Sequence, residues 1–217
     1  MTALRAIIAR DVGLALKAGG GAAQAIIFFA LIIVLFAFAV GPDPALLARI
    51  AAPVLWTTVL LAALLTLDRL FQADYEDGGL DILVQRTPTL ALLVLAKAAA
   101  HWISTCLPLI LATPVMAITL NLPLSAYAPL LISLLIGTPA LAITGALGAA
   151  LVFPLRRASV LLTLIIGPLF APVMIFGVAA ATPGSGAAPL LFLTAVSLMS
   201  VIVGPIAGAA AIRFNLA

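Results

Sequence analysis

The sequence has little charge. Only 8% of its 217 residues are Asp, Glu, Lys or Arg, whereas about 25% is usual for a soluble domain. A chain that is 65% hydrophobic, with a mean hydropathy of +1.37, cannot cover a water-facing surface with polar groups. Since a bilayer requires every backbone polar group to be satisfied internally, long apolar runs of this kind predict an all-α integral membrane protein.

Several residue types that enzymes and pumps require are scarce or missing. The single Cys106 excludes an intrachain disulfide, and the single His101 excludes a His-pair metal site and bis-His haem ligation within one copy. No GxxxxGK[ST] motif occurs, so the chain cannot cradle a nucleotide phosphate by itself. None of the seven carboxylates lies in the middle of an apolar run, which disfavours ion-coupled transport. We therefore expect a non-catalytic membrane subunit, with no metal site and no cofactor of its own, that is either passive or powered by a partner.

Six apolar runs are long enough to cross a bilayer, which takes about 20 helical residues. They lie at about residues 22–40, 50–67, 90–120, 126–153, 159–181 and 189–212, and they predict a single transmembrane domain over residues 1–217. The third run would measure about 46 Å as a straight helix. We therefore expect it to protrude, tilt or break, with Pro108 and Pro114 as the break points.

The residues before the first run carry Arg5, Arg10 and Lys17, and three consecutive glycines separate them from it. As a helix, this segment would gather apolar residues on one face, with Asp11 among them. One interpretation is an N-terminal helix that lies along the membrane interface. The other is a frayed basic tail.

Charge predicts how the six runs are oriented. If the N-terminus is cytoplasmic, nine basic residues fall on the cytoplasmic side and Arg49 alone falls on the other. The nine are Arg5, Arg10, Lys17, Arg69, Arg86, Lys97, Arg156, Arg157 and Arg213. The positive-inside rule therefore predicts that both termini and the segment 68–88 are cytoplasmic.

The segment 68–88 between the second and third runs is acidic. It holds five of the seven acidic residues, Asp68, Asp74, Glu76, Asp77 and Asp81. Leu80, Leu83 and Val84 have helical spacing, after a sharp entry at Gly78 and before a stop at Pro88, so we predict a short amphipathic helix. Acidic side chains beside an apolar stripe would complement a partner that carries Arg or Lys. The alternative is a solvated acidic loop that only joins two spans.

A polar stripe follows one face of the third run. Lys97, His101, Ser104, Thr105 and Pro108 have helical spacing, and polar residues within a span are candidates for a lining or gating role. His101 lies one turn, about 6 Å, beyond Lys97. This shallow depth favours another interpretation, an aromatic anchor at the interface, and haem ligation is the third.

Two strings resemble known families. DYEDGGLDILVQRTP followed by LALLVLAKAAAHW resembles the cytoplasmic coupling segment of ABC exporter permeases. The fuller FQADYEDGGLDILVQRTP, with LAKAAAHWISTCLPLILATP, resembles the CcmB family, the membrane subunit of the cytochrome c maturation haem exporter. The similarity covers the whole length, including the LNLP turn at residues 120–123, although VQRTP stands where a more apolar LLSP is expected.

The resemblance implies a multi-pass subunit of the bacterial inner membrane. Its expected partners are the ATPase subunit CcmA, the proteins CcmC and CcmD, the haem chaperone CcmE and membrane lipids, with no nucleic acid. ATP would be hydrolysed on the partner ATPase, and haem would be the species transported or handed over. The residues expected to contact the ATPase are Asp74, Tyr75, Glu76, Asp77, Gly78, Leu80 and Leu83.

A second copy of the permease is also expected, and a GxxxG pattern at Gly204 and Gly208 gives it weak support. Two alternatives remain open. One is an ABC exporter permease for another substrate, and the other is a non-transporting scaffold for a haem-handling complex. A passive channel fits least, because no run is evenly polar along one face.

Overall fold

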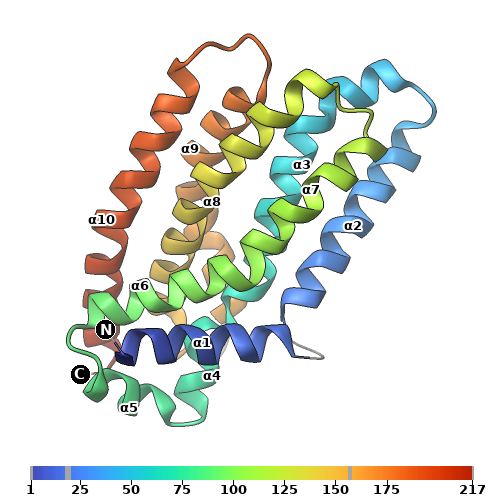
Figure 1. The fold of residues 1–217 in the computed structure, drawn as a ribbon. Coiled ribbons are helices and arrows are strands. Elements are labelled where there is room, and N and C mark those ends of the chain that lie inside the picture. The colour runs from blue at the N-terminus through green and yellow to red at the C-terminus, as the bar shows by residue number, and fades with distance from the viewer. Residues whose placement is uncertain (1, 18–20, 156–157, 217) are drawn as a thin grey trace.

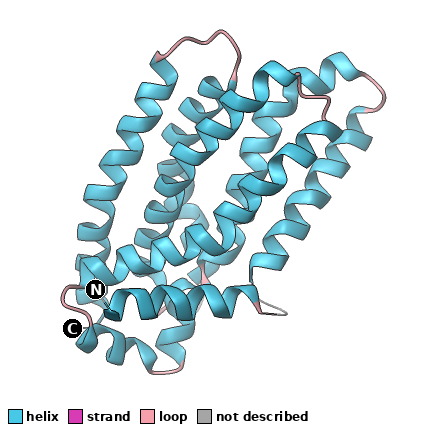
Figure 2. Ribbon diagram, viewed as in Figure 1, coloured by secondary structure: helices cyan, strands magenta, loops and turns pink. Residues whose placement is uncertain are grey.

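The computed structural model describes residues 2–17, 21–155 and 158–216, and helices form nearly all of it, with no strand among those residues (Figures 1 and 2). Six helices in the described part are long and apolar enough to cross a membrane, which confirms the predicted all-α class and the predicted number of runs. They are α2 (Gly21–Val40), α3 (Pro44–Leu67), the third span described below, α8 (Leu124–Val152), α9 (Ala158–Ala181) and α10 (Ala188–Leu216).

The second span begins earlier than its apolar run, which starts near residue 50. α3 begins at Pro44 because Asp43 caps it: the Asp43 carboxylate accepts hydrogen bonds of 3.0 Å from the backbone N–H groups of Ala45 and Leu46. Proline suits the first helical position, where its missing N–H has no partner to lose.

The third span is helical without interruption from residue 90 to residue 119. Its parts are α6 (Leu90–His101), a π-helical turn η1 (Trp102–Cys106) and α7 (Leu107–Thr119). In the π turn, the Leu107 N–H donates to the carbonyl of Trp102, five residues earlier, just before Pro108, which has no N–H to donate. The chain stays helical through Pro108 and Pro114, so it does not break there, but the α-helical pattern changes to the π turn just before Pro108. Figure 1 shows that α6 lies more nearly across the bundle than α7, so the long span is accommodated by tilting and bending.

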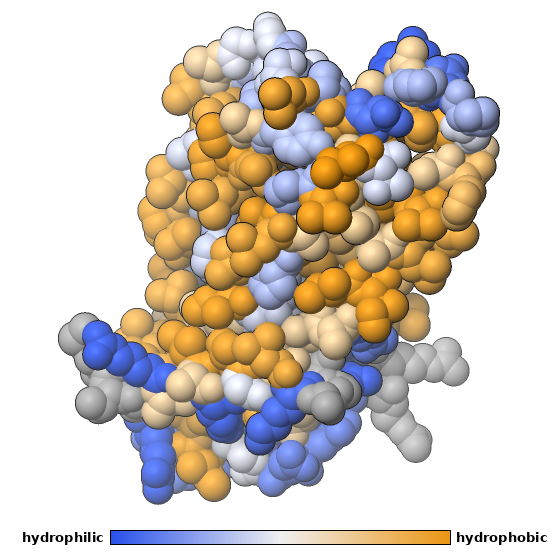
Figure 3. Space-filling view, turned by 45° about the vertical axis from the view of Figure 1, so that its right-hand side comes forward, coloured by the Kyte–Doolittle hydropathy of each residue, from blue (hydrophilic) through white to orange (hydrophobic). Residues whose placement is uncertain are grey.

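Three shorter helices gather at one end of the bundle, where both ends of the described chain also lie (Figure 1). They are α1 (Thr2–Leu16), α4 (Arg69–Glu76) and α5 (Gly79–Arg86). α1 lies across the axes of the spans, and Figure 3 shows a band of hydrophilic side chains at this end, a smaller hydrophilic group at the opposite end and a largely hydrophobic surface between them (Figures 1 and 3). We call the end that carries α1 the polar end. The arrangement fits an interfacial helix, and the cytoplasmic orientation stays a prediction.

A tryptophan fixes the packing in the middle of the bundle. Trp56 of α3 is fully buried, and its indole N–H donates to the Ser133 hydroxyl of α8 at 2.9 Å. A Cβ added at Gly137 or at Gly177 would lie 2.5 Å from the Trp56 ring, so both positions need glycine. These contacts hold α3, α8 and α9 together.

The GxxxG pattern is used inside this chain. A Cβ on Gly204 would collide with Ile143 of α8, and one on Gly208 would lie 3.0 Å from Val94 of α6. The two glycines therefore let α10 approach α8 and α6 closely. Because this face is already covered, the pattern no longer supports a second permease copy, which remains a prediction.

Candidate functional site at the polar end

The acidic segment folds into two short helices joined by a tight turn. α4 continues α3 after Asp68, and α5 begins at Gly79, one residue before the start that the leucine spacing predicts. Gly78, with φ of +70°, makes the turn, in a left-handed conformation that favours glycine. Asp81 in the first turn of α5 and Arg86 in its last turn suit the helix dipole. The predicted amphipathic helix is therefore present, while its docking role is still a prediction.

The residues expected to contact a partner lie on different sides of this segment. Tyr75, Glu76, Asp77 and Gly78 are exposed, whereas Leu80 is buried and only 1% exposed. Leu83 is half-buried against the core. The leucine stripe thus holds α5 onto the bundle and does not face outward.

One exposed apolar residue was missed by the sequence interpretation. Ile82 is 55% exposed on α5, beside Asp81 and on the opposite side of the helix from Leu80. The spacing could have found it, because Leu80, Leu83 and Val84 share one face of the predicted helix and position 82 falls on the opposite face. We call the exposed set the outer surface, and its members are Tyr75, Glu76, Asp77, Asp81 and Ile82.

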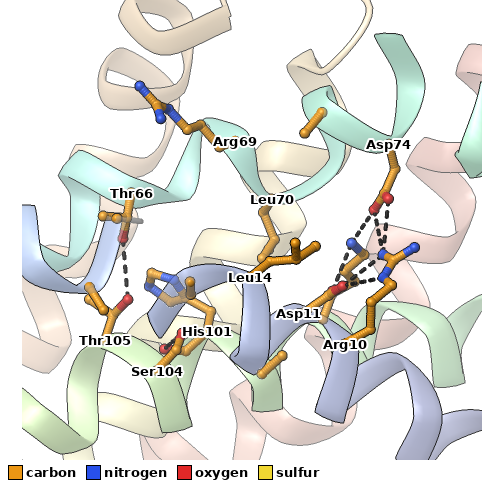
Figure 4. Close-up of a pocket in the computed structure, with 16 residues that line it drawn as sticks. Arg10, Asp11, Leu14, Thr66, Arg69, Leu70, Asp74, His101, Ser104 and Thr105 are labelled. Carbon is orange, nitrogen blue, oxygen red and sulfur yellow. Dashed lines mark hydrogen bonds and ion pairs between the residues drawn. The ribbon is translucent and has the colours of Figure 1, made fainter. Parts of the chain in front are cut away.

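Asp74 turns inward and joins a cluster of charges from three helices (Figure 4). Lys97 of α6 is ion-paired with Asp74 of α4 and with Asp11 of α1, the latter at 2.8 Å. Arg10 of α1 reaches the two oxygens of Asp74 at 2.9 and 3.1 Å and also binds Asp11 at 2.8 Å. The Lys97 ammonium lies 5.9 Å from the centroid of the Phe71 ring.

The cluster is balanced and mostly shielded from water. Lys97 is only 3% exposed, and the side chains of Asp11 and Asp74 are 13% and 16% exposed. Partial burial lowers the pKa of Arg10, but the hydrogen bond and the charge of Asp11, and then those of Asp74, outweigh it and raise this pKa. Two carboxylates face two basic side chains. The cluster therefore joins α1, α4 and α6 by charge at the polar end.

A cavity of about 250 Å³ lies beside the cluster, between α1, α4 and the third span (Figure 4). Four of the five predicted stripe residues line it, namely Lys97, His101, Ser104 and Thr105. Pro108 does not, and it is half-buried farther along the span.

His101 is buried in this cavity and is not exposed on the outside of the bundle. It is 4% exposed, so the anchor interpretation does not fit. Its neighbour Trp102 donates from its indole nitrogen to Thr138 of α8 at 2.9 Å, which is an internal packing contact. An anchor must be exposed as well as shallow, and here α1 and α4 cover this part of the third span, with Lys97 bound to Asp11 and Asp74.

The described residues hold no group of three or more His, Cys, Asp or Glu side chains that could bind a metal ion. What the polar end offers is therefore an exposed acidic and apolar surface, an internal charge cluster and a polar cavity. All three meet at α4, which carries Tyr75 and Glu76 outward and Asp74 inward.

Comparison with known proteins connects this architecture to one family. The profile of the CcmB family, described as CcmB protein, matches residues 2–215. A protein of Bradyrhizobium diazoefficiens named heme exporter protein B is 50% identical over 221 residues, covering the whole of both chains. Proteins with the same name are 46% identical in Rhodobacter capsulatus, over 98% of this chain and all of theirs, and 37% identical in Escherichia coli K12, over 87% and 88%.

Proposed function

The chain belongs to the CcmB family, and from this membership we propose that it is the permease subunit of an ABC haem exporter in cytochrome c maturation. The observation that carries the proposal is the full-length identity of 50% to a heme exporter protein B. In this assignment the chain is a non-catalytic subunit of the bacterial inner membrane, and ATP is hydrolysed on a separate ATPase subunit.

The ATPase docks on the outer surface of α4 and α5. Three exposed carboxylates, Glu76, Asp77 and Asp81, lie on the same segment as the exposed side chains of Tyr75 and Ile82. This combination fits a partner groove with an apolar floor and an Arg- or Lys-containing rim. We assign the groove to the ATPase subunit CcmA.

The charge cluster supports a route by which docking reaches the membrane. Asp74 and Glu76 lie on the same two-turn helix, one bound inward and the other exposed. A displacement of α4 by the ATPase would be resisted by the Lys97 ion pair and would therefore act on α6 and the third span. Lys97 is also ion-paired with Asp11, so a movement of α6 would act on α1 as well.

Haem enters this proposal as cargo handed over within the complex. The cavity beside the cluster measures about 250 Å³, below the roughly 300–1,000 Å³ of pockets for drug-sized ligands, so it does not fit a porphyrin. In our proposal, CcmC, CcmD and the chaperone CcmE carry out the transfer, which the movement of this subunit drives. Neither ATP nor haem needs a resident site on this chain.

The test reverses charge on the outer surface. In the Glu76→Lys/Asp77→Lys variant, the amount of ATPase that co-purifies should fall at least tenfold, because two attractive contacts become repulsive. The matched control is Gly13→Lys, which adds a lysine at the same end of the molecule, on exposed α1 with open space around the new side chain. Undiminished ATPase binding by the first variant would contradict docking at this surface.

A further inference from the structure

His101 presents an unused hydrogen-bonding atom to the cavity. Its Nε2 is buried and has no hydrogen-bond partner among the described residues. Figure 4 shows the imidazole between Thr66 of α3 and Leu14 of α1, directed into the space between these helices. Burying a polar nitrogen without a hydrogen-bond partner costs free energy. The Nε2 atom therefore indicates that a bound group supplies the missing hydrogen bond.

The same wall carries hydroxyl groups with spare donor capacity. The Ser104 hydroxyl has only a long contact of 3.4 Å with the backbone carbonyl of His101. The Thr105 hydroxyl lies 3.5 Å from that of Thr66, at the limit of hydrogen bonding. With the imidazole, they form a cradle that can donate several hydrogen bonds to one acceptor-rich group.

The charge around the cavity favours an anion. Its lining holds three cations, Arg10, Arg69 and Lys97, and two carboxylates, Asp11 and Asp74. Both carboxylates are already bound to Arg10 and Lys97. The remaining cation, Arg69, is exposed, and its guanidinium points away from His101 in Figure 4. The lining therefore carries one positive charge more than negative, at its rim, which one negative charge on a ligand would balance.

The position of the cavity identifies the source of that anion. Gly21, the first residue of α2, and Thr66, near the end of α3, both line it, so it lies where two spans end. Leu14 and Leu70 give it apolar walls. We propose that the cavity binds the phosphodiester of an anionic membrane phospholipid, with His101 and the Ser104 and Thr105 hydroxyls as donors. This site does not depend on which substrate the complex exports.

The experiment measures phospholipid bound to the full-length protein. Purified protein, exchanged into detergent and then given phosphatidylglycerol, is analysed by native mass spectrometry for bound lipid. His101→Ala should weaken binding on the order of tenfold, the effect of losing one hydrogen bond to a charged group. His101→Gln keeps a side-chain N–H and should retain most of the binding. Thr113→Val, a buried change about three turns beyond His101 on the same span and outside the cavity, should bind as the original chain does.

Two further arms separate the sources of phosphate. Inorganic phosphate is titrated and followed by ³¹P line broadening, and the lipid arm is repeated in nanodiscs of phosphatidylcholine with and without phosphatidylglycerol. Preferential, His101-dependent retention of phosphatidylglycerol supports the proposal. Binding of inorganic phosphate alone overturns the lipid assignment. No phosphate binding in either arm, or equal lipid retention by all variants, overturns the site itself.

Discussion

Replacing Lys97 by Met should destabilise the protein strongly. The side chain is 3% exposed and is ion-paired with both Asp11 and Asp74. Methionine has a similar length and no charge, so the apolar stem is conserved while the ammonium is lost. Arg10 would then face two carboxylates alone, and one buried negative charge would have no counter-ion.

The expected cost follows from the burial of the cluster. Removing one partner of a buried ion pair costs about 3–5 kcal/mol, because the remaining charge stays desolvated. For a chain of about 150–250 residues, 1 kcal/mol corresponds to about 2–4 °C in the unfolding midpoint, so we expect a decrease of about 6–20 °C. Circular dichroism at 222 nm during heating in detergent measures it. Arg5→Met is the control, since Arg5 is exposed on α1 and should change stability by less than about 0.5 kcal/mol.

A second variant distinguishes lost charge balance from lost packing. The triple change Asp11→Asn/Asp74→Asn/Lys97→Met removes both carboxylates together with the lysine and leaves no unpaired buried anion. It should be more stable than Lys97→Met alone, because well-packed neutral groups can replace a buried ion pair at little cost. If Lys97→Met unfolds at the temperature of the original chain, the lysine does not compensate the carboxylates, and the coupling of α4 to α6 loses its basis.

Three other predictions follow from contacts at the polar end and in the core. Ile82→Asp should lower ATPase affinity about tenfold in a pull-down titration without changing the unfolding midpoint, whereas Leu80→Asp should lower both, because only Leu80 is buried. Gly177→Ala should cost about 1–3 kcal/mol in thermal unfolding, since its Cβ would lie 2.5 Å from Trp56. Ser133→Ala should cost about 1–3 kcal/mol in the same assay, because it leaves the Trp56 indole N–H buried without an acceptor.

The sequence predicted local features well because each depends on neighbouring residues. Apolar runs of bilayer length predicted six spans, and the leucine spacing after Gly78 predicted α5 to within one residue. The same spacing could not say which way Leu80 faces, because an apolar stripe looks alike whether the bundle or a partner covers it. Here the bundle covers it, and Ile82 on the other side is left exposed.

The charge cluster was beyond local reasoning, since its members come from α1, α4 and α6. Two of its residues were unusual for their place in the sequence: Asp11 lies within an apolar face of α1, and Lys97 lies within an apolar run. Two misplaced charges of opposite sign can relieve one another in a membrane protein, because neither is stable alone in a dry environment. Matching such charges of opposite sign across the chain would have predicted the ion pair between Asp11 and Lys97, although not the participation of Asp74.

The arrangement at α4 explains why the acidic segment contains two kinds of acid. Glu76 and Asp77 are exposed, and their negative charge remains available for a partner, while the charge of Asp74 is neutralised inside the protein. If the ATPase docks on α4 as proposed, a push on this helix reaches the third span only when the inner contacts of the helix hold more strongly than the outer ones. The ion pairs of Lys97 favour this, because separating them leaves a buried ammonium without a counter-ion. In that proposal, a loop with the same acids on its surface would bind the partner without any ionic contact to α6.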